Sequence, residues 1–283
     1  MLDRFLELSD FIGRVLLKVS REKSTRGKPP MMLTPEEEEI AIEIRDILKP
    51  MSQVTKEICS EKSVTLSKCI PLISLLQKSI NNYEATHPVS FNFKQTLLTN
   101  LEKRFRTVEN IKVAAMATIL DPRFKKLHFQ NAVSAATAVG AINTILKNRT
   151  KEVAQDCLRD ENLNNNDVNS IWSYHDQLQS QQLTNADSDS AGGIAIEIRQ
   201  YLNRPVCSRN TNPFEEWITM KPTYPHLYEV AMEYLPILAT SVPSERLFSK
   251  AGQIITKRRN RLSGQHLNQL IFLLSINFEM WKN

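Results

Sequence analysis

The sequence predicts a mainly α-helical protein, and three observations support this fold class. Only 7 of the 283 residues are glycine, whereas glycine makes up about 7% of an average protein. Apolar residues recur at intervals of three and four along most of the chain, which is the period of an amphipathic helix. No stretch before residue 235 alternates apolar and polar residues with period two, so a β-sheet has little support there.

The N-terminal 160 residues contain a series of helical patterns. In residues 2–18, apolar side chains form one broad stripe, and a second helix is predicted to begin at Thr34, Pro35 and Glu37. Thr34 and Glu37 have the spacing of a capping box, and Pro35 suits the first helical position. Pro50 is expected to kink or divide this helix. Further helices are predicted over residues 64–82, 91–108, 110–119 and 131–158.

Residues 161–192 differ in composition from the rest of the chain. The stretch 160–190 carries six acidic residues and no Lys or Arg, and it is rich in Asn, Gln and Ser. A segment of this kind buries little apolar surface, so we predict a disordered linker. The predicted organisation is therefore a helical domain over 1–160, a linker over 161–192 and a C-terminal region over 193–283.

The C-terminal region again shows helical periodicity, with helices expected near 194–202, 224–235, 244–251 and 263–281. The last helix carries a wide apolar stripe, which indicates a packing helix or a subunit interface. We predict self-association through this stripe and through the segment from Trp217 to Tyr234. The candidate dimerisation residues are Trp217, Leu262, Leu267, Leu270, Ile271, Leu274 and Phe278.

The formal charge of +5 belongs to the end of the chain. Residues 1–240 carry equal numbers of basic and acidic side chains, while residues 241–283 carry seven basic and two acidic ones. Lys257, Arg258, Arg259 and Arg261 precede the last helix and are candidates to contact a phosphate backbone without reading its sequence. An ordinary solvated loop explains the same cluster equally well.

Other function classes find little support in the residues. The motifs GxxxxGK[ST], GxGxxG, GxSxG and HExxH are absent, and the five histidines are far apart, so we predict no metal site, cofactor or small-molecule substrate. The four cysteines form no CxxC pair, which argues against a disulfide framework or a cysteine-based zinc site. No apolar run approaches the length of a membrane span.

One stretch carries a dense motif. Residues 241–262 read SVPSERLFSKAGQIITKRRNRL, which resembles the C-terminal region of the hAT superfamily of transposases. The resemblance continues through Leu267, Asn268 and Leu270, and upstream through Asn212–Trp217 and Tyr224-Pro225, although Glu216-Trp217 replaces the double Trp of the family. Residues 120–125, LDPRFK, also resemble a family element.

This resemblance implies a fold and a chemistry. hAT transposases have an RNase H-like core, interrupted by a helical insertion, in which two aspartates and one glutamate bind divalent metal. Glu245 stands at the position of that glutamate, and the aspartates have no counterpart here, so Mg²⁺ is expected only if a longer chain supplies them. Residues 1–160 would then be insertion-like, and 193–283 would be the closing helices of a truncated RNase H-like core.

Two residues of these motifs also have structural interpretations. Asp121 is expected to order a turn before Pro122 and not to bind metal. Glu245 and Arg246 are expected to form surface charge or a buried ion pair that fixes helix packing.

Three functions follow, in order of preference. The first is a transposase-derived protein, catalytically inactive as given, whose C-terminal region mediates dimerisation. The alternatives are a portion of an active Mg²⁺-dependent cut-and-paste transposase and non-specific DNA binding by the basic segment. A nuclear location is expected from the resemblance and from the basic residues 257–261.

Overall fold

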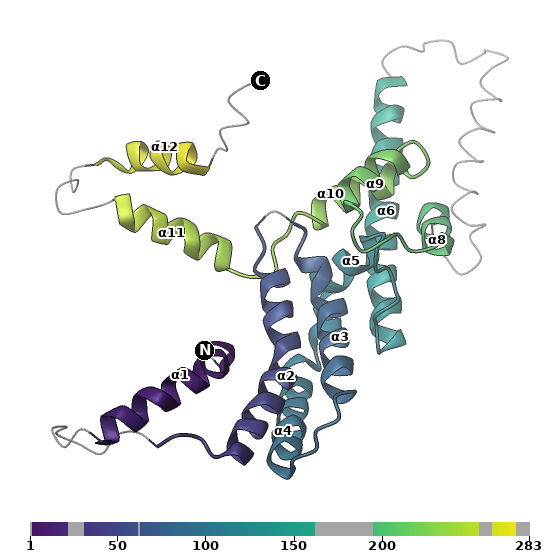
Figure 1. The fold of residues 1–283 in the computed structure, drawn as a ribbon. Coiled ribbons are helices and arrows are strands. Elements are labelled where there is room, and N and C mark those ends of the chain that lie inside the picture. Colours follow the sequence, from purple (N-terminus) through teal and green to yellow (C-terminus); the bar gives the residue numbers. More distant parts are fainter. Residues whose placement is uncertain (1, 22–30, 62, 162–194, 255–261, 276–283) are drawn as a thin grey trace, which may run out of the picture.

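A computed structural model of the chain describes residues 2–21, 31–61, 63–161, 195–254 and 262–275 (Figure 1). In these residues all regular structure is helical, with eleven α-helices, two short 3₁₀ helices and no strand. The prediction of a mainly α protein is therefore confirmed for the described part of the chain. The predicted linker 161–192 lies almost wholly outside it.

The helices follow the predicted order closely. Their bounds are α1 (Leu2–Arg21), α2 (Pro35–Ile58), η1 (Leu66–Lys68), α3 (Cys69–Asn81), α4 (Pro88–Phe105), η2 (Val108–Asn110), α5 (Lys112–Leu120), α6 (Ala132–Glu161), α8 (Ile196–Asn203), α9 (Pro213–Met220), α10 (Pro225–Tyr234), α11 (Val242–Ile254) and α12 (Gly264–Ser275). Four of them begin with proline, whose fixed φ suits the first turn and whose missing N–H costs nothing there.

Helix α2 begins as the sequence predicts. The Thr34 side chain accepts a hydrogen bond from the backbone N–H of Glu37, and the Glu37 carboxylate accepts one from the backbone N–H of Thr34. Pro50 does not divide the helix, which continues to Ile58. Apolar side chains on both sides of Pro50 pack in the same cluster, Ile47 before it and Met51 after it, and this packing keeps the two halves of α2 together.

The buried apolar residues form two cores. The smaller core joins α2, α3 and α4 through Ile47, Leu76, Ile80 and Leu101. The larger core joins α3, α5, α6, α8, α9 and α10. Its largest members include Met116, Leu120, Ile142, Ile198, Tyr201, Trp217, Leu227 and Leu235. Residues from both sides of the predicted linker therefore share one core.

Helices α1, α11 and α12 extend away from this body of the molecule (Figure 1). Helix α1 packs on α2, and the most extensive contact of α11 is with α12. The α11–α12 hairpin, residues 242–254 and 262–275, follows directly from the end of α10 through residues 235–241. Among its residues whose burial the structure describes, only the small Ala251 is a buried apolar one.

Glu43 connects α2 to the start of α4. Its carboxylate accepts hydrogen bonds from the backbone N–H of Thr86 at 2.9 Å, from the Thr86 hydroxyl, and from the backbone N–H of His87 at 3.3 Å. The hydrogen bond from the Thr86 side chain is the largest contribution that lowers the pKa of Glu43, from 4.5 to about 2. All these donors stabilise the ionised form.

We expect the substitution Glu43→Gln to lower the free energy of unfolding in a pH-dependent manner. A carboxylate with a depressed pKa in the folded state stabilises the fold above its unfolded pKa, and this contribution is lost as pH falls through the folded value. The difference between wild type and Glu43→Gln should therefore be largest above about pH 5 and shrink as the pH approaches 2. Urea unfolding across this range measures it. The control is Glu84→Gln, an exposed residue in the α3–α4 loop that also contains Thr86. An equal pH dependence in this control would contradict the stabilising role of the Glu43 carboxylate.

Candidate functional site

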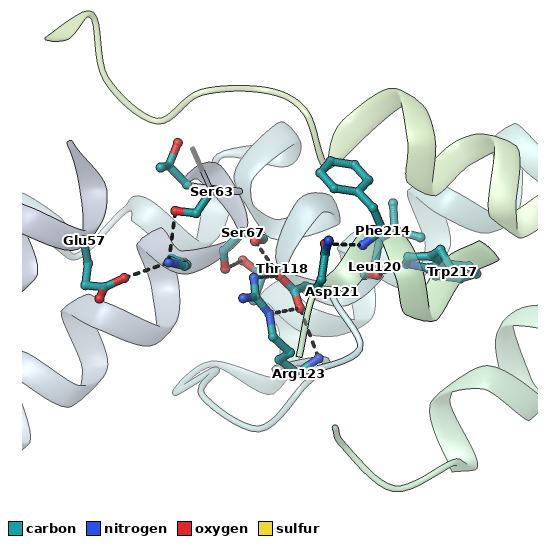
Figure 2. A network of polar contacts seen from close by, with 12 residues as sticks. Glu57, Ser63, Ser67, Thr118, Leu120, Asp121, Arg123, Phe214 and Trp217 are labelled. Atoms are coloured by element: carbon teal, nitrogen blue, oxygen red, sulfur yellow. Dashed lines mark hydrogen bonds and ion pairs between the residues drawn. The ribbon is translucent and has the colours of Figure 1, made fainter. Parts of the chain in front are cut away.

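The turn after α5 contains a buried charged network (Figure 2). Asp121 is fully buried, and its carboxylate accepts hydrogen bonds from the Arg123 guanidinium at 2.7 and 2.9 Å and from the Arg123 backbone N–H at 3.1 Å. The Ser67 hydroxyl donates a further hydrogen bond at 2.6 Å. Asp121 therefore orders the turn before Pro122 as predicted, and it also ties that turn to η1.

The last two residues of α5, directly before this turn, offer backbone carbonyls to two aromatic residues of the C-terminal region. The Trp217 indole N–H donates to the carbonyl of Leu120 at 2.8 Å, and the Tyr201 hydroxyl donates to the carbonyl of Ile119 at 3.1 Å. The two rings stack with centroids 5.0 Å apart. Both side chains are fully buried, so Trp217 belongs to the core of the single chain and does not expose an aromatic surface to a partner.

Lys125 completes the connection between the turn and α8. Its backbone has a φ of 47°, in the left-handed region that few non-glycine residues occupy. Its Nζ donates to the carbonyls of Tyr201 and Arg204, each at 2.6 Å. These carbonyls lie at the C-terminal end of α8, where no further helical N–H group is available as a donor. Burial lowers the pKa of Lys125 to about 8. The LDPRFK element is thus a clasp, residues 120–125, between the helices on the two sides of the predicted linker.

The α11–α12 hairpin exposes large apolar side chains. The exposed fractions are 73% for Phe248, 41% for Leu247, 64% for Phe272 and 47% for Leu273. The predicted dimerisation residues Leu262, Leu267, Leu270 and Ile271 are half-buried, and α12 packs on α11. Leu274 lies on α12, and Phe278 lies outside the described residues. Periodicity alone did not single out Phe248 or Phe272, because it cannot show which side of a helix a neighbour covers.

Glu245 lies in the first turn of α11 and is exposed. Its carboxylate accepts a hydrogen bond from the Ser241 hydroxyl at 2.6 Å, and its backbone N–H donates to the Ser241 carbonyl at 2.9 Å. A carboxylate here complements the positive end of the helix dipole. The next residue, Arg246, forms an ion pair with Glu61 at 2.9 Å. Both partners are exposed, so this is a surface ion pair and not the buried one that the sequence offered as an alternative to surface charge.

The basic cluster predicted to contact a phosphate backbone lies outside the described residues; its members are Lys257, Arg258, Arg259 and Arg261. Among the residues that the structure does describe, no group of three or more His, Cys, Asp or Glu side chains is placed to hold a metal ion. None of the described helices is both long and apolar enough to cross a membrane.

We expect Asp121→Asn to destabilise the protein by about 3–5 kcal/mol, because it leaves the buried Arg123 guanidinium without its charged partner. Chemical denaturation would measure the loss. The matched control is Asp46→Asn, which removes a carboxylate from a partly exposed pair with Arg45 and should cost about 1 kcal/mol or less. Equal losses in the two variants would show that the clasp does not depend on the buried charge pair.

Comparison with known proteins agrees with the C-terminal motif. Residues 197–275, from α8 to α12, match the hAT family C-terminal dimerisation region. The chain is also 22% identical over 242 residues to the human zinc finger BED domain-containing protein 4, an alignment that covers 80% of this chain and 19% of that relative. The chain thus spans about a fifth of the length of the relative it matches. We conclude that this protein contains a hAT family C-terminal dimerisation region and is distantly homologous to a BED zinc finger protein.

Proposed function

We propose that this protein is derived from a hAT transposase, self-associates through its α11–α12 hairpin and is catalytically inactive. The observation that carries the proposal is the overlap of two features. The hairpin falls within the match to a dimerisation region, and it presents exposed Leu and Phe side chains on both of its helices.

The packing of α8 to α10 narrows the surface that a partner can use. Trp217, Leu227 and Val230 are fully buried in the larger core, so the inner faces of α9 and α10 are already occupied within one chain. The hairpin is the part of the matched region that is not built into that core. This favours the hairpin over the segment from Trp217 to Tyr234 as the contact between copies.

The energetics of the exposed residues support a second copy as the partner. Fully burying a Leu or Phe side chain contributes about 1.5–3 kcal/mol. Four such side chains on each of two copies can offset the several kcal/mol that association costs in translational and rotational freedom. A two-fold arrangement presents the same surface from both copies, so a single apolar patch is self-complementary.

Glu245 supports the catalytic part of the proposal through its contacts. Its carboxylate is engaged by Ser241 at the start of α11, which is a helix-start role that requires no metal. We further propose that α8 to α12 correspond to the closing helices of an RNase H-like core, that residues 1–160 correspond to the helical insertion, and that the protein is nuclear. These three assignments rest on the motif resemblance.

We expect the double substitution Phe248→Asp, Leu273→Asp to weaken self-association at least tenfold, because each introduced carboxylate would lose its hydration in an apolar interface. Sedimentation equilibrium over a concentration series measures the dissociation constant. Phe91→Asp on α4, also an exposed Phe, is the matched control and should leave association unchanged. A wild type that stays monomeric at high micromolar concentration would rule the proposal out, as would a double variant that associates normally.

A second candidate function is non-specific DNA binding, favoured by the excess of basic residues in 241–283. Retention on a DNA column should fall steeply between about 50 and 200 mM salt. Replacing Lys257, Arg258, Arg259 and Arg261 by Gln should abolish most of it. The control replaces four exposed basic residues elsewhere, Lys103, Arg104, Arg106 and Lys112, by Gln. Equal loss of retention in both variants would show a general charge effect and not a site.

A further inference from the structure

Arg246 connects the hairpin to the end of α2, which lies far from it in the sequence. Its Nη1 donates to the Oε1 of Glu61 at 2.9 Å and to the backbone carbonyl of Cys59 at 3.2 Å. Cys59 is the C-cap residue of α2. The guanidinium therefore contacts both a carboxylate and the C-terminal end of a helix.

This end of α2 is a favourable place for a cation. The last carbonyls of a helix have no helical donor, and the helix dipole gives them partial negative charge. Glu61 adds a full negative charge two residues beyond the C-cap. An Arg side chain reaches both acceptors with one nitrogen, and its charge complements both.

In the described residues, the hydrogen bonds between the start of the hairpin and the body of the molecule involve Arg246 and Ala239. The Ala239 N–H donates to the Thr65 hydroxyl at 3.0 Å, but Ala239 precedes the helix. Once α11 has begun, its main packing partner is α12, and both helices extend away from the body of the molecule (Figure 1). Rotation of the hairpin about residues 239–241 would therefore have to break the Arg246 contacts.

We propose that Arg246 is a positioning residue for self-association, because its contacts with Cys59 and Glu61 hold the hairpin in the orientation in which two copies meet. This inference rests on the self-association proposed above. Contacts that preset the bound orientation reduce the entropy lost on association. The pair is exposed, so it contributes too little to determine the stability of the fold, and its effect falls on the orientation of the hairpin.

The test uses charge reversal on the full chain. Arg246→Glu and Glu61→Arg should each raise the dissociation constant about three- to tenfold, as expected for an exposed ion pair replaced by repulsion. The double substitution Arg246→Glu, Glu61→Arg restores opposite charges and should recover part of the affinity, because the Cys59 carbonyl still lacks its cationic donor. Arg149→Glu is the matched control. Arg149 also joins two helices through exposed carboxylates, those of Glu229 and Glu233, but lies on α6.

A distance measurement separates orientation from stability. Spin labels at Gln53 on α2 and Lys250 on α11, with the four native cysteines replaced by alanine, report the direction of the hairpin by electron paramagnetic resonance. Wild type should give one narrow distance distribution, and Arg246→Glu a broad one that the double substitution narrows again. Urea unfolding should show that all variants retain the stability of wild type within about 1 kcal/mol.

The outcomes for this inference and for the proposed function differ. If wild type associates and Arg246→Glu changes neither the dissociation constant nor the distance distribution, the positioning role is overturned while self-association stands. A double substitution that recovers none of the affinity and leaves the distance distribution broad would also overturn it, because the charge pair with Glu61 would then play no part in positioning the hairpin. A monomeric wild type would overturn the proposed function and, with it, the role of Arg246 in association.

Discussion

The buried carboxylate of Asp121 is the interaction on which the connection between the two parts of the chain depends. It pairs with Arg123, accepts a hydrogen bond from Ser67 and orders the turn directly after the α5 carbonyls that bind the side chains of Trp217 and Tyr201. A buried charge of this kind is costly unless every acceptor site is satisfied. Here the groups that satisfy the carboxylate also hold the turn in place. Tyr201 of α8 and Trp217 of α9 bind the residues directly before this turn.

This attachment explains why the hairpin is the available surface of the dimerisation region. Tyr201 of α8 and Trp217 of α9 bind the end of α5, and α10 packs on α5 and α6. The apolar faces of these helices are therefore buried within the chain. Helices α11 and α12 come after the clasp and have each other as their main partners. Leu247, Phe248, Phe272 and Leu273 are therefore left exposed on a segment that contributes little to the core.

Local rules account for most of the helices, and they fail where distant segments meet. The capping box at Thr34 and Pro35 at the first position of α2 depend on neighbours in the sequence, and they are found as predicted. Period and propensity also led to α2, but not to its continuity through Pro50, because packing on α3 and α4 keeps its two halves together. The apolar stripe of the last helix agrees with α12, yet its Leu267 and Leu270 are half-buried within the single chain, whereas the neighbouring Phe272 is exposed.

The sequence by itself determined the helical class, the turn-ordering role of Asp121 and the resemblance to the hAT family, since each depends on residue type and short spacing. Only the tertiary structure decided that Trp217 lies in the core, that Lys125 caps α8 and that Arg246 reaches the end of α2. These outcomes join residues 76 to 187 positions apart. The sequence pattern shows the period of a helix, but it does not show which other helix packs on its apolar face. That packing partner decides whether an apolar residue lies in the core or at an interface.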